Sequence, residues 1–236
     1  RLYAPLALWQ RMEPPDWPQL AQFARLGIPA GLAILVEVTS FTLMALFVAR
    51  QGTLASASHQ IAANLAALCY MVPLSLAIAT SARVSYWRGA GDEVTARRLV
   101  AMGWRLAAMG GLVLACALFL SREGLARIYS GNPEVVAITA SLLAWVAAYH
   151  VADAIQTFCI FVLRCYRITV APLVIYCLLL WGGGLAGGYW LAYGTDSVLP
   201  AWLHPGTPAP FWAGSACALL VTAVVFSAVV RKATNR

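Results

Sequence analysis

Six apolar segments recur along the chain, and each is long enough to cross a lipid bilayer as a helix. A membrane-spanning helix needs about 20 mostly apolar residues to cross roughly 30 Å of hydrocarbon. The segments that meet this length are Leu26–Ala49, Leu54–Tyr86, Val100–Leu120, Val135–Leu163, Val170–Tyr193 and Phe211–Val230. Because a helix satisfies its backbone hydrogen bonds within the span, the sequence predicts an all-α membrane protein, a bundle of six transmembrane helices.

The composition argues against a soluble domain and against a nucleic-acid partner. Hydrophobic residues make up 61% of the chain and charged residues only 11%, whereas soluble domains are about 45–50% apolar and about a quarter charged. The net charge of +7 is not gathered into the basic stripe with aromatic readers that nucleic-acid recognition needs. The sequence contains no GxSxG or HExxH motif, so we do not expect a hydrolytic enzyme.

The basic residues are distributed unevenly across the predicted membrane. If the N-terminal segment is cytoplasmic, 13 of the 16 basic residues lie on the cytoplasmic side, and only Arg50, Arg122 and Arg127 lie on the other. Cytoplasmic loops of membrane proteins carry an excess of lysine and arginine. We therefore predict a multi-pass protein with both termini of this segment in the cytoplasm, which six spans allow.

Two acidic residues lie deep inside apolar segments. Glu37 is about eleven residues, or some 16 Å, into the first span, and Asp153 has a similar depth in the fourth. A charge at the centre of a span costs on the order of 2.5–3.5 kcal/mol, so such residues usually have a partner or face a water-filled cavity. We predict a cation site at Glu37 and Asp153, with Na⁺ or a proton as the ligand. The alternative is a protonated structural carboxyl that joins two helices.

Polar side chains accompany both carboxylates at helical spacing. Trp145, Tyr149, Asp153 and Gln156 share one face of the fourth span, although ordinary helix packing also produces such stripes. A phenol and a carboxylate one turn apart offer the hard oxygen ligands that alkali cations accept. The side chains that we expect to support the site or to line a substrate path are Ser40, Gln60, Asn64, Met71, His150 and Gln156.

A series of motifs extends over most of the chain. They are Leu26-Gly27-Ile28-Pro29 followed by Glu37, Ala57-Ser58-His59-Gln60-Ile61-Ala62, Met71-Val72-Pro73, Gly89-Ala90-Gly91-Asp92, Asp153-Ala154-Ile155-Gln156 and Leu163-Arg164-Cys165-Tyr166. In this order and spacing they resemble the second six-helix lobe of the multidrug and toxic compound extrusion (MATE) transporters, bacterial NorM-like branch. The chain departs from the family pattern at Cys165, where a small residue is usual.

The resemblance implies a fold and a function. Residues 25–232 would be the C-terminal lobe of a twelve-helix transporter in the inner (plasma) membrane, and residues 1–24 a cytoplasmic linker between lobes. Cationic, amphipathic drugs would leave the cell in exchange for Na⁺ or H⁺ by alternating access, without a cofactor. The partners would be the N-terminal lobe of the same transporter and membrane lipid. Glu37, Tyr149 and Asp153 match the cation-binding positions of this lobe.

Two alternatives to a drug antiporter remain open. A related lipid-linked oligosaccharide flippase would favour a basic cavity for an anionic headgroup, and the sequence has no arginine or lysine deep in its spans. A non-transporting membrane subunit or scaffold would leave the two mid-membrane carboxylates unexplained.

Overall fold

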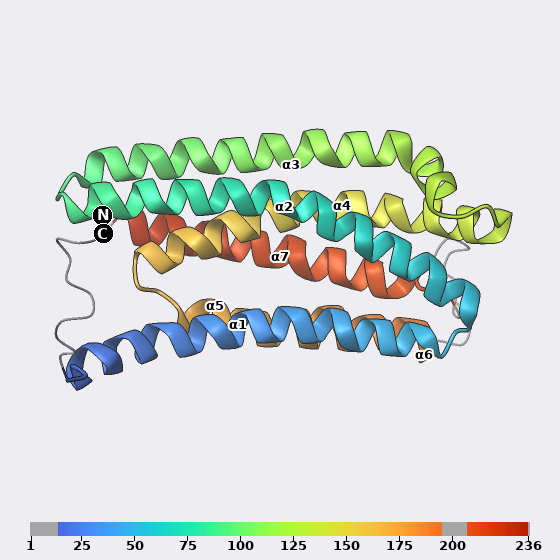
Figure 1. The fold of residues 1–236 in the computed structure, drawn as a ribbon, viewed down its shortest axis with the longest axis horizontal. Coiled ribbons are helices and arrows are strands. Elements are labelled where there is room, and N and C mark those ends of the chain that lie inside the picture. The colour runs from blue at the N-terminus through green and yellow to red at the C-terminus, as the bar shows by residue number, and fades with distance from the viewer. Residues whose placement is uncertain (1–13, 195–206, 236) are drawn as a thin grey trace, which may run out of the picture.

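A computed structural model describes residues 14–194 and 207–235 as a bundle of long helices (Figure 1). Across these two ranges the chain forms no strand. The elements in order are α1 (Trp17–Ala49), α2 (Thr53–Gly89), α3 (Glu93–Tyr129), α4 (Pro133–Cys165), α5 (Val170–Tyr176), the π-helix η2 (Cys177–Ala186), α6 (Gly187–Tyr193) and α7 (Ala209–Thr234). The short α5, η2 and α6 follow one another without a break and make a single span.

The predicted number and order of spans are confirmed, because six helices are long and apolar enough to cross a membrane. Most helices are longer than their apolar segments, because polar caps extend them past the hydrocarbon. Asp92, just before α3, accepts hydrogen bonds from the Thr95 amide at 2.9 Å and its hydroxyl at 2.6 Å. Both hydrogen bonds lower the pKa of the Asp92 carboxyl, and the bond from the Thr95 hydroxyl has the larger effect. The sequence therefore predicts the spans better than the helix ends.

The expected linker, residues 1–24, is only partly within the described chain. Its first 13 residues lie outside the described ranges. From Trp17 onward the chain is already α1, whose first turn is capped by Asp16 through a 3.2 Å hydrogen bond from the Gln19 amide. The first helix thus begins before its apolar segment, inside the stretch that we expected to be linker.

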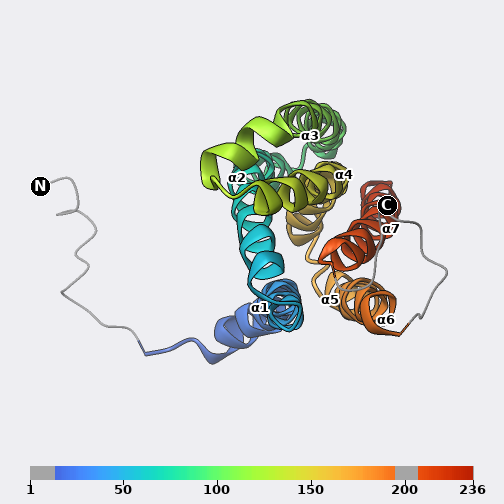
Figure 2. The same ribbon diagram turned by 90° about the vertical axis from the view of Figure 1, so that its right-hand side faces the viewer.

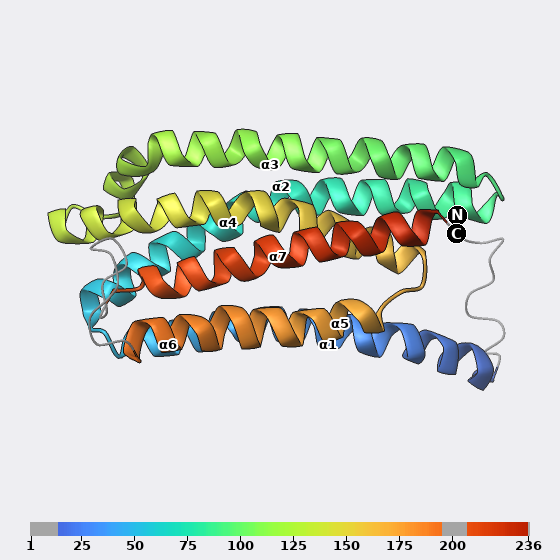
Figure 3. The same cartoon turned by 180° about the vertical axis from the view of Figure 1, so that it is seen from behind.

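Helix α4 occupies the centre of the bundle. It packs against α2, α3 and α7, while α1 packs against α5, η2 and α2. Viewed along the helices, α2, α3, α4 and α7 form one group, and α1 lies with α5 and α6 in a second (Figure 2). Seen from behind, α7 lies between α4 and the α5–α6 span (Figure 3). This arrangement buries α4 and leaves much of α1 exposed.

Helix α2 changes direction near its middle (Figure 1), and Pro73 lies inside it. A proline within a helix removes one backbone hydrogen bond and its ring clashes with the preceding turn, which bends the helix. The bend agrees with the kink that Pro73 predicts. Its effect is to carry the first half of α2 toward α1 while the second half follows α3 and α4.

Glycines allow the α5–α6 span to lie against α7. A Cβ added at Gly214 of α7 would stand 2.9 Å from the backbone oxygen of Gly184 and 3.1 Å from the backbone nitrogen of Gly188. Small residues at such crossings let two membrane helices approach closely and gain van der Waals contact. Gly184 and Gly188 of this span are therefore part of a packing surface for α7.

We expect Gly214→Ala to destabilise the protein, because its new methyl group meets backbone atoms that cannot rotate away. Overpacking of this kind costs about 1–3 kcal/mol. Gly182→Ala is the matched control, since a Cβ at Gly182 has nothing within 4 Å. Thermal unfolding of both variants in the same detergent should show a lower melting temperature for Gly214→Ala alone. Equal melting temperatures would contradict the close contact.

Candidate cation-binding site

The carboxylate of Asp153 is buried at the centre of the bundle. Only 3% of the residue is exposed. One turn further along α4, the Gln156 side-chain amide donates to Asp153 Oδ1 at 2.9 Å and to Thr157 Oγ1 at 3.1 Å. Its oxygen accepts from the hydroxyl of Tyr176, which comes from α5. Because both ends of the Gln156 amide are engaged, Gln156 holds Asp153 in one orientation.

Glu37 faces Asp153 from the other group of helices. It lies on α1, is half-buried, and interacts electrostatically with Asp153 and with Arg164 at the end of α4. Within the described ranges no side chain donates a hydrogen bond to the Glu37 carboxylate. Two carboxylates in a medium of low dielectric repel each other, and a cation between them relieves that repulsion. The two acids that the sequence selected by depth are thus close enough to interact electrostatically.

Three aromatic side chains, from α1, α4 and α7, pack together one helical turn from Asp153. Tyr149 is 6% exposed, and its ring centroid lies 5.9 Å from that of Phe41 on α1 and 5.8 Å from that of Trp212 on α7. Edge-to-face contacts of this kind stabilise aromatic clusters. Tyr149 is therefore held where α1, α4 and α7 meet, one turn from Asp153.

A small cavity of about 20 Å³ lies next to Tyr149. Ser40, also in its lining, has a buried hydroxyl without a hydrogen-bond partner. A volume of this size holds about one water molecule. The cavity therefore has room for one water or one small ion and offers it the hydroxyls of Ser40 and Tyr149. Neither Glu37 nor Asp153 is in its lining.

The other predicted residues divide into two sets. His150 is 2% exposed and its Nε2 has no partner, so it is buried on α4 one turn before Asp153, with no described contact to either carboxylate. Gln60, Asn64 and Met71 are exposed on α2, and none of them has a described contact with either carboxylate. Asn64 instead accepts a 3.0 Å hydrogen bond from the Tyr129 hydroxyl at the end of α3. The structure does not bring this second set to the site.

Several residues near the carboxylates were not predicted from the sequence. Tyr70 on α2 interacts electrostatically with both acids and forms a hydrogen bond with Thr157. Tyr176 reaches the site through Gln156. Thr157 follows Asp153 at i+4, a spacing that could have identified it. A lone tyrosine in an apolar helix gives no such signal, because only the packing of helices reveals which face it takes.

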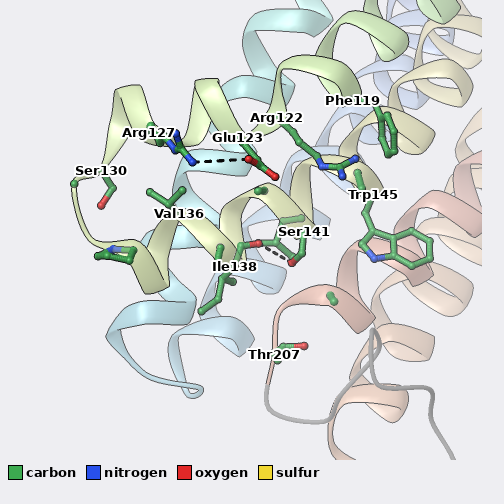
Figure 4. Close-up of a pocket in the computed structure, with 17 residues that line it drawn as sticks. Phe119, Arg122, Glu123, Arg127, Ser130, Val136, Ile138, Ser141, Trp145 and Thr207 are labelled. Carbon is green, nitrogen blue, oxygen red and sulfur yellow. Dashed lines mark hydrogen bonds and ion pairs between the residues drawn. The ribbon is translucent and has the colours of Figure 1, made fainter.

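A large cavity lies away from the carboxylates. It measures about 1230 Å³ and lies where the end of α3 meets the start of α4 and of α7 (Figure 4). Glu123 and Arg127 form an ion pair of 3.9 Å in its lining, and Trp145 points toward it. Trp145 therefore faces this cavity, although it shares a helical stripe with Tyr149 and Asp153.

The residues suit an alkali cation or a proton better than a transition metal. Across residues 14–194 and 207–235, no group of three or more His, Cys, Asp or Glu side chains could hold a metal ion. Glu37, Asp153 and the nearby hydroxyls are hard oxygen donors, which transition metals prefer less than nitrogen and sulfur. A bound ion would thus depend on two carboxylates together with neutral oxygens.

Comparison with known proteins places this arrangement in a family. A family model described as MatE matches residues 29–190. The chain is 37% identical to the probable multidrug resistance protein NorM of Aromatoleum aromaticum over 236 residues, all of this chain and 50% of that protein. It is also 37% identical to the multidrug resistance protein MdtK of Photorhabdus laumondii over 222 residues, which cover 92% of this chain and 47% of that one. The chain spans about half the length of these relatives.

Solved structures share the fold. The Vibrio cholerae MATE transporter VcmN in its bent form superposes with a TM-score of 0.79 at 18% identity, over 97% of this chain and 49% of that one. The eukaryotic MATE transporter AtDTX14 gives a TM-score of 0.78 at 22% identity, over 93% and 50%. Together with the family model and the NorM and MdtK relatives, these matches show that the chain belongs to the MatE family, the multidrug and toxic compound extrusion transporters.

Proposed function

We propose that this chain is the C-terminal lobe of a multidrug efflux antiporter that exports cationic, amphipathic drugs in exchange for Na⁺ or H⁺. The observation that carries the proposal is the pairing of Glu37 on α1 with Asp153 on α4 inside the membrane-spanning bundle. The relatives named multidrug resistance proteins support drugs as the substrate class. No enzymatic step is part of the proposal.

In this mechanism the coupling cation and the drug compete for the same negative charge. A cation bound between Glu37 and Asp153 removes one unit of the negative charge of the two carboxylates, reduces their repulsion and draws α1 toward α4. Without the cation, the pair attracts a positively charged drug to the face that α1 leaves exposed. The hydrogen bonds from Gln156 to Asp153 and from Tyr176 to Gln156 join α4 and α5 and do not involve α1. They therefore keep Asp153 in place whether or not the cation is bound.

A second lobe is the natural partner of that exposed face. Helix α1 shows apolar side chains along its length, among them Ile28, Leu32 and Leu35, which are 61%, 42% and 52% exposed. Alternating access requires two bundles that rock against each other around a site near the bilayer midplane. We therefore propose that an N-terminal lobe of the same transporter and membrane lipid cover this face, with both termini of the segment on the cytoplasmic side of the inner membrane.

Drug accumulation in cells tests the proposal. Bacteria that lack their major efflux pumps would express the full-length gene product, and intracellular ethidium, a cationic fluorescent drug, would be measured over time. We expect lower accumulation than in empty-vector cells. Collapse of the coupling gradient by an ionophore should abolish the difference, and a sodium or a proton ionophore identifies the ion. Equal accumulation in expressing and empty-vector cells, with the protein present in the membrane, would refute the proposed function.

A further inference from the structure

A groove of about 770 Å³ runs between α3 and α7, next to the α2–α3 loop. Both helices pack on α4, which lies between them (Figure 2). Across the groove the indole nitrogen of Trp104 on α3 donates a 3.1 Å hydrogen bond to the Ser227 hydroxyl on α7. This bond links the two walls, so the groove is a fixed feature of the bundle.

Every charged side chain in the groove lining is an arginine. Arg97 and Arg105 come from α3 and Arg231 from α7, and all three are exposed. Within the described ranges, the salt bridges join Arg88 to Glu93 and Arg127 to Glu123, and neither includes a groove arginine. Three arginines thus line one groove, and no carboxylate among the described residues forms a salt bridge with any of them.

Arg105 and Arg231 flank the apolar parts of their helices. Arg105 directly precedes the most apolar part of α3, which starts at Leu106, and Arg231 directly follows the apolar part of α7. Trp104, one residue before Arg105, is of the type that gathers at the membrane interface. The lining also contains Val100 and Val230, which are apolar but buried. Toward the hydrocarbon, the surfaces of α3 and α7 continue with exposed apolar side chains, among them Leu106 and Val224.

The opposite end of the bundle shows a different arrangement. The 1230 Å³ cavity there also contains two arginines, but Arg127 pairs with Glu123, and Arg122 lies 4.2 Å over the ring of Phe119. Its cations therefore already have partners within the protein. Of these two cavities, only the groove between α3 and α7 has charged arginines without a described salt bridge or cation–π contact.

We propose that this groove binds the phosphate headgroup of an anionic phospholipid, with an acyl chain along the apolar walls of α3 and α7. Guanidinium groups bind phosphate oxygens through paired hydrogen bonds. Basic pockets between membrane helices on the cytoplasmic side attract anionic lipids in the same way. A free phosphate would use the arginines alone, whereas a lipid also uses the apolar walls.

Lipid binding to the purified full-length gene product tests this site. Native mass spectrometry would count bound phosphatidylglycerol and phosphatidylcholine after exposure to an equal mixture of both. The test variant is Arg105→Gln/Arg231→Gln. The control is Arg83→Gln/Arg98→Gln, which removes two exposed arginines at the same end of the bundle that do not line the groove. Melting temperatures with added phosphatidylglycerol or inorganic phosphate give a second measurement.

We expect the wild type and the control to prefer phosphatidylglycerol, and the test variant to lose this preference by on the order of tenfold, the size expected for two interfacial cations. Phosphatidylglycerol should raise the melting temperature of the wild type, and inorganic phosphate should not. If the double variant cannot be purified, Arg105→Gln and Arg231→Gln are compared singly with Arg98→Gln. Equal loss in the control, no preference in the wild type, or full stabilisation by phosphate alone would overturn the proposal.

Discussion

Glu37→Gln and Asp153→Asn should each lower drug efflux by about tenfold or more, while the amount of protein in the membrane stays the same. The amide keeps the shape of the side chain but removes the negative charge that attracts a cation. A tenfold loss corresponds to roughly 1.4 kcal/mol. This energy is smaller than the cost of placing a charge at the centre of a span, so the loss of one carboxylate charge is large enough to produce the effect. Drug resistance and ethidium efflux in cells measure the effect.

The matched control for these variants is Glu134→Gln. Glu134 is an exposed acid in the first turn of α4, the helix that carries Asp153. Its neutralisation should leave efflux unchanged, since it lies at the helix end and not beside the carboxylate pair. Immunoblots of membrane fractions show whether each variant is present at the wild-type level. Wild-type efflux from both Glu37→Gln and Asp153→Asn would mean that the pair does not couple transport.

Residues 1–236 expressed alone should insert in the membrane but transport nothing. Insertion needs no partner, because each helix satisfies its own backbone hydrogen bonds. Transport is expected to fail because α1, which carries Glu37, packs mainly against α2, α5 and η2 and leaves many apolar side chains exposed. Rocking of two bundles requires a second one, and the curated relatives are about twice as long as this chain.

Co-expression of the fragment with the other half of the transporter is the positive control of this experiment. Ethidium efflux should be absent with the fragment alone and should return when the other half of the transporter is supplied on a second plasmid. Alkaline extraction of membranes shows whether the fragment alone is integrated. Ion-dependent drug uptake by purified fragment in liposomes, as a monomer, would show that the six helices are a complete transporter.

The sequence predicted the spans and the two carboxylates because both are signals along a single helix. Apolar length identifies a span, and a charge at mid-span identifies an unusual residue, without reference to any neighbour. Glu37 and Asp153 were selected in this way, and in the structure the charge of Asp153 acts on Glu37. That they bind a cation stays a prediction.

Features that depend on contact between helices could not be read in the same way. Tyr70 and Tyr176 reach the site only because α2 and α5 turn one face toward α4. Trp145 shares the helical stripe of Asp153 yet lines a different cavity, since α4 is long enough to serve both. The π-helix η2 likewise has no marker in the apolar sequence beyond its glycines.

Ion-driven transport in liposomes is the most direct test of the carboxylate pair. The full-length gene product would be reconstituted with an imposed Na⁺ gradient or an imposed H⁺ gradient, and movement of ethidium against its own gradient would be followed by fluorescence. The account predicts transport driven by one of these gradients in the wild type and in Glu134→Gln, and none in Glu37→Gln/Asp153→Asn. Gradient-driven transport by that double variant at the wild-type rate would contradict it.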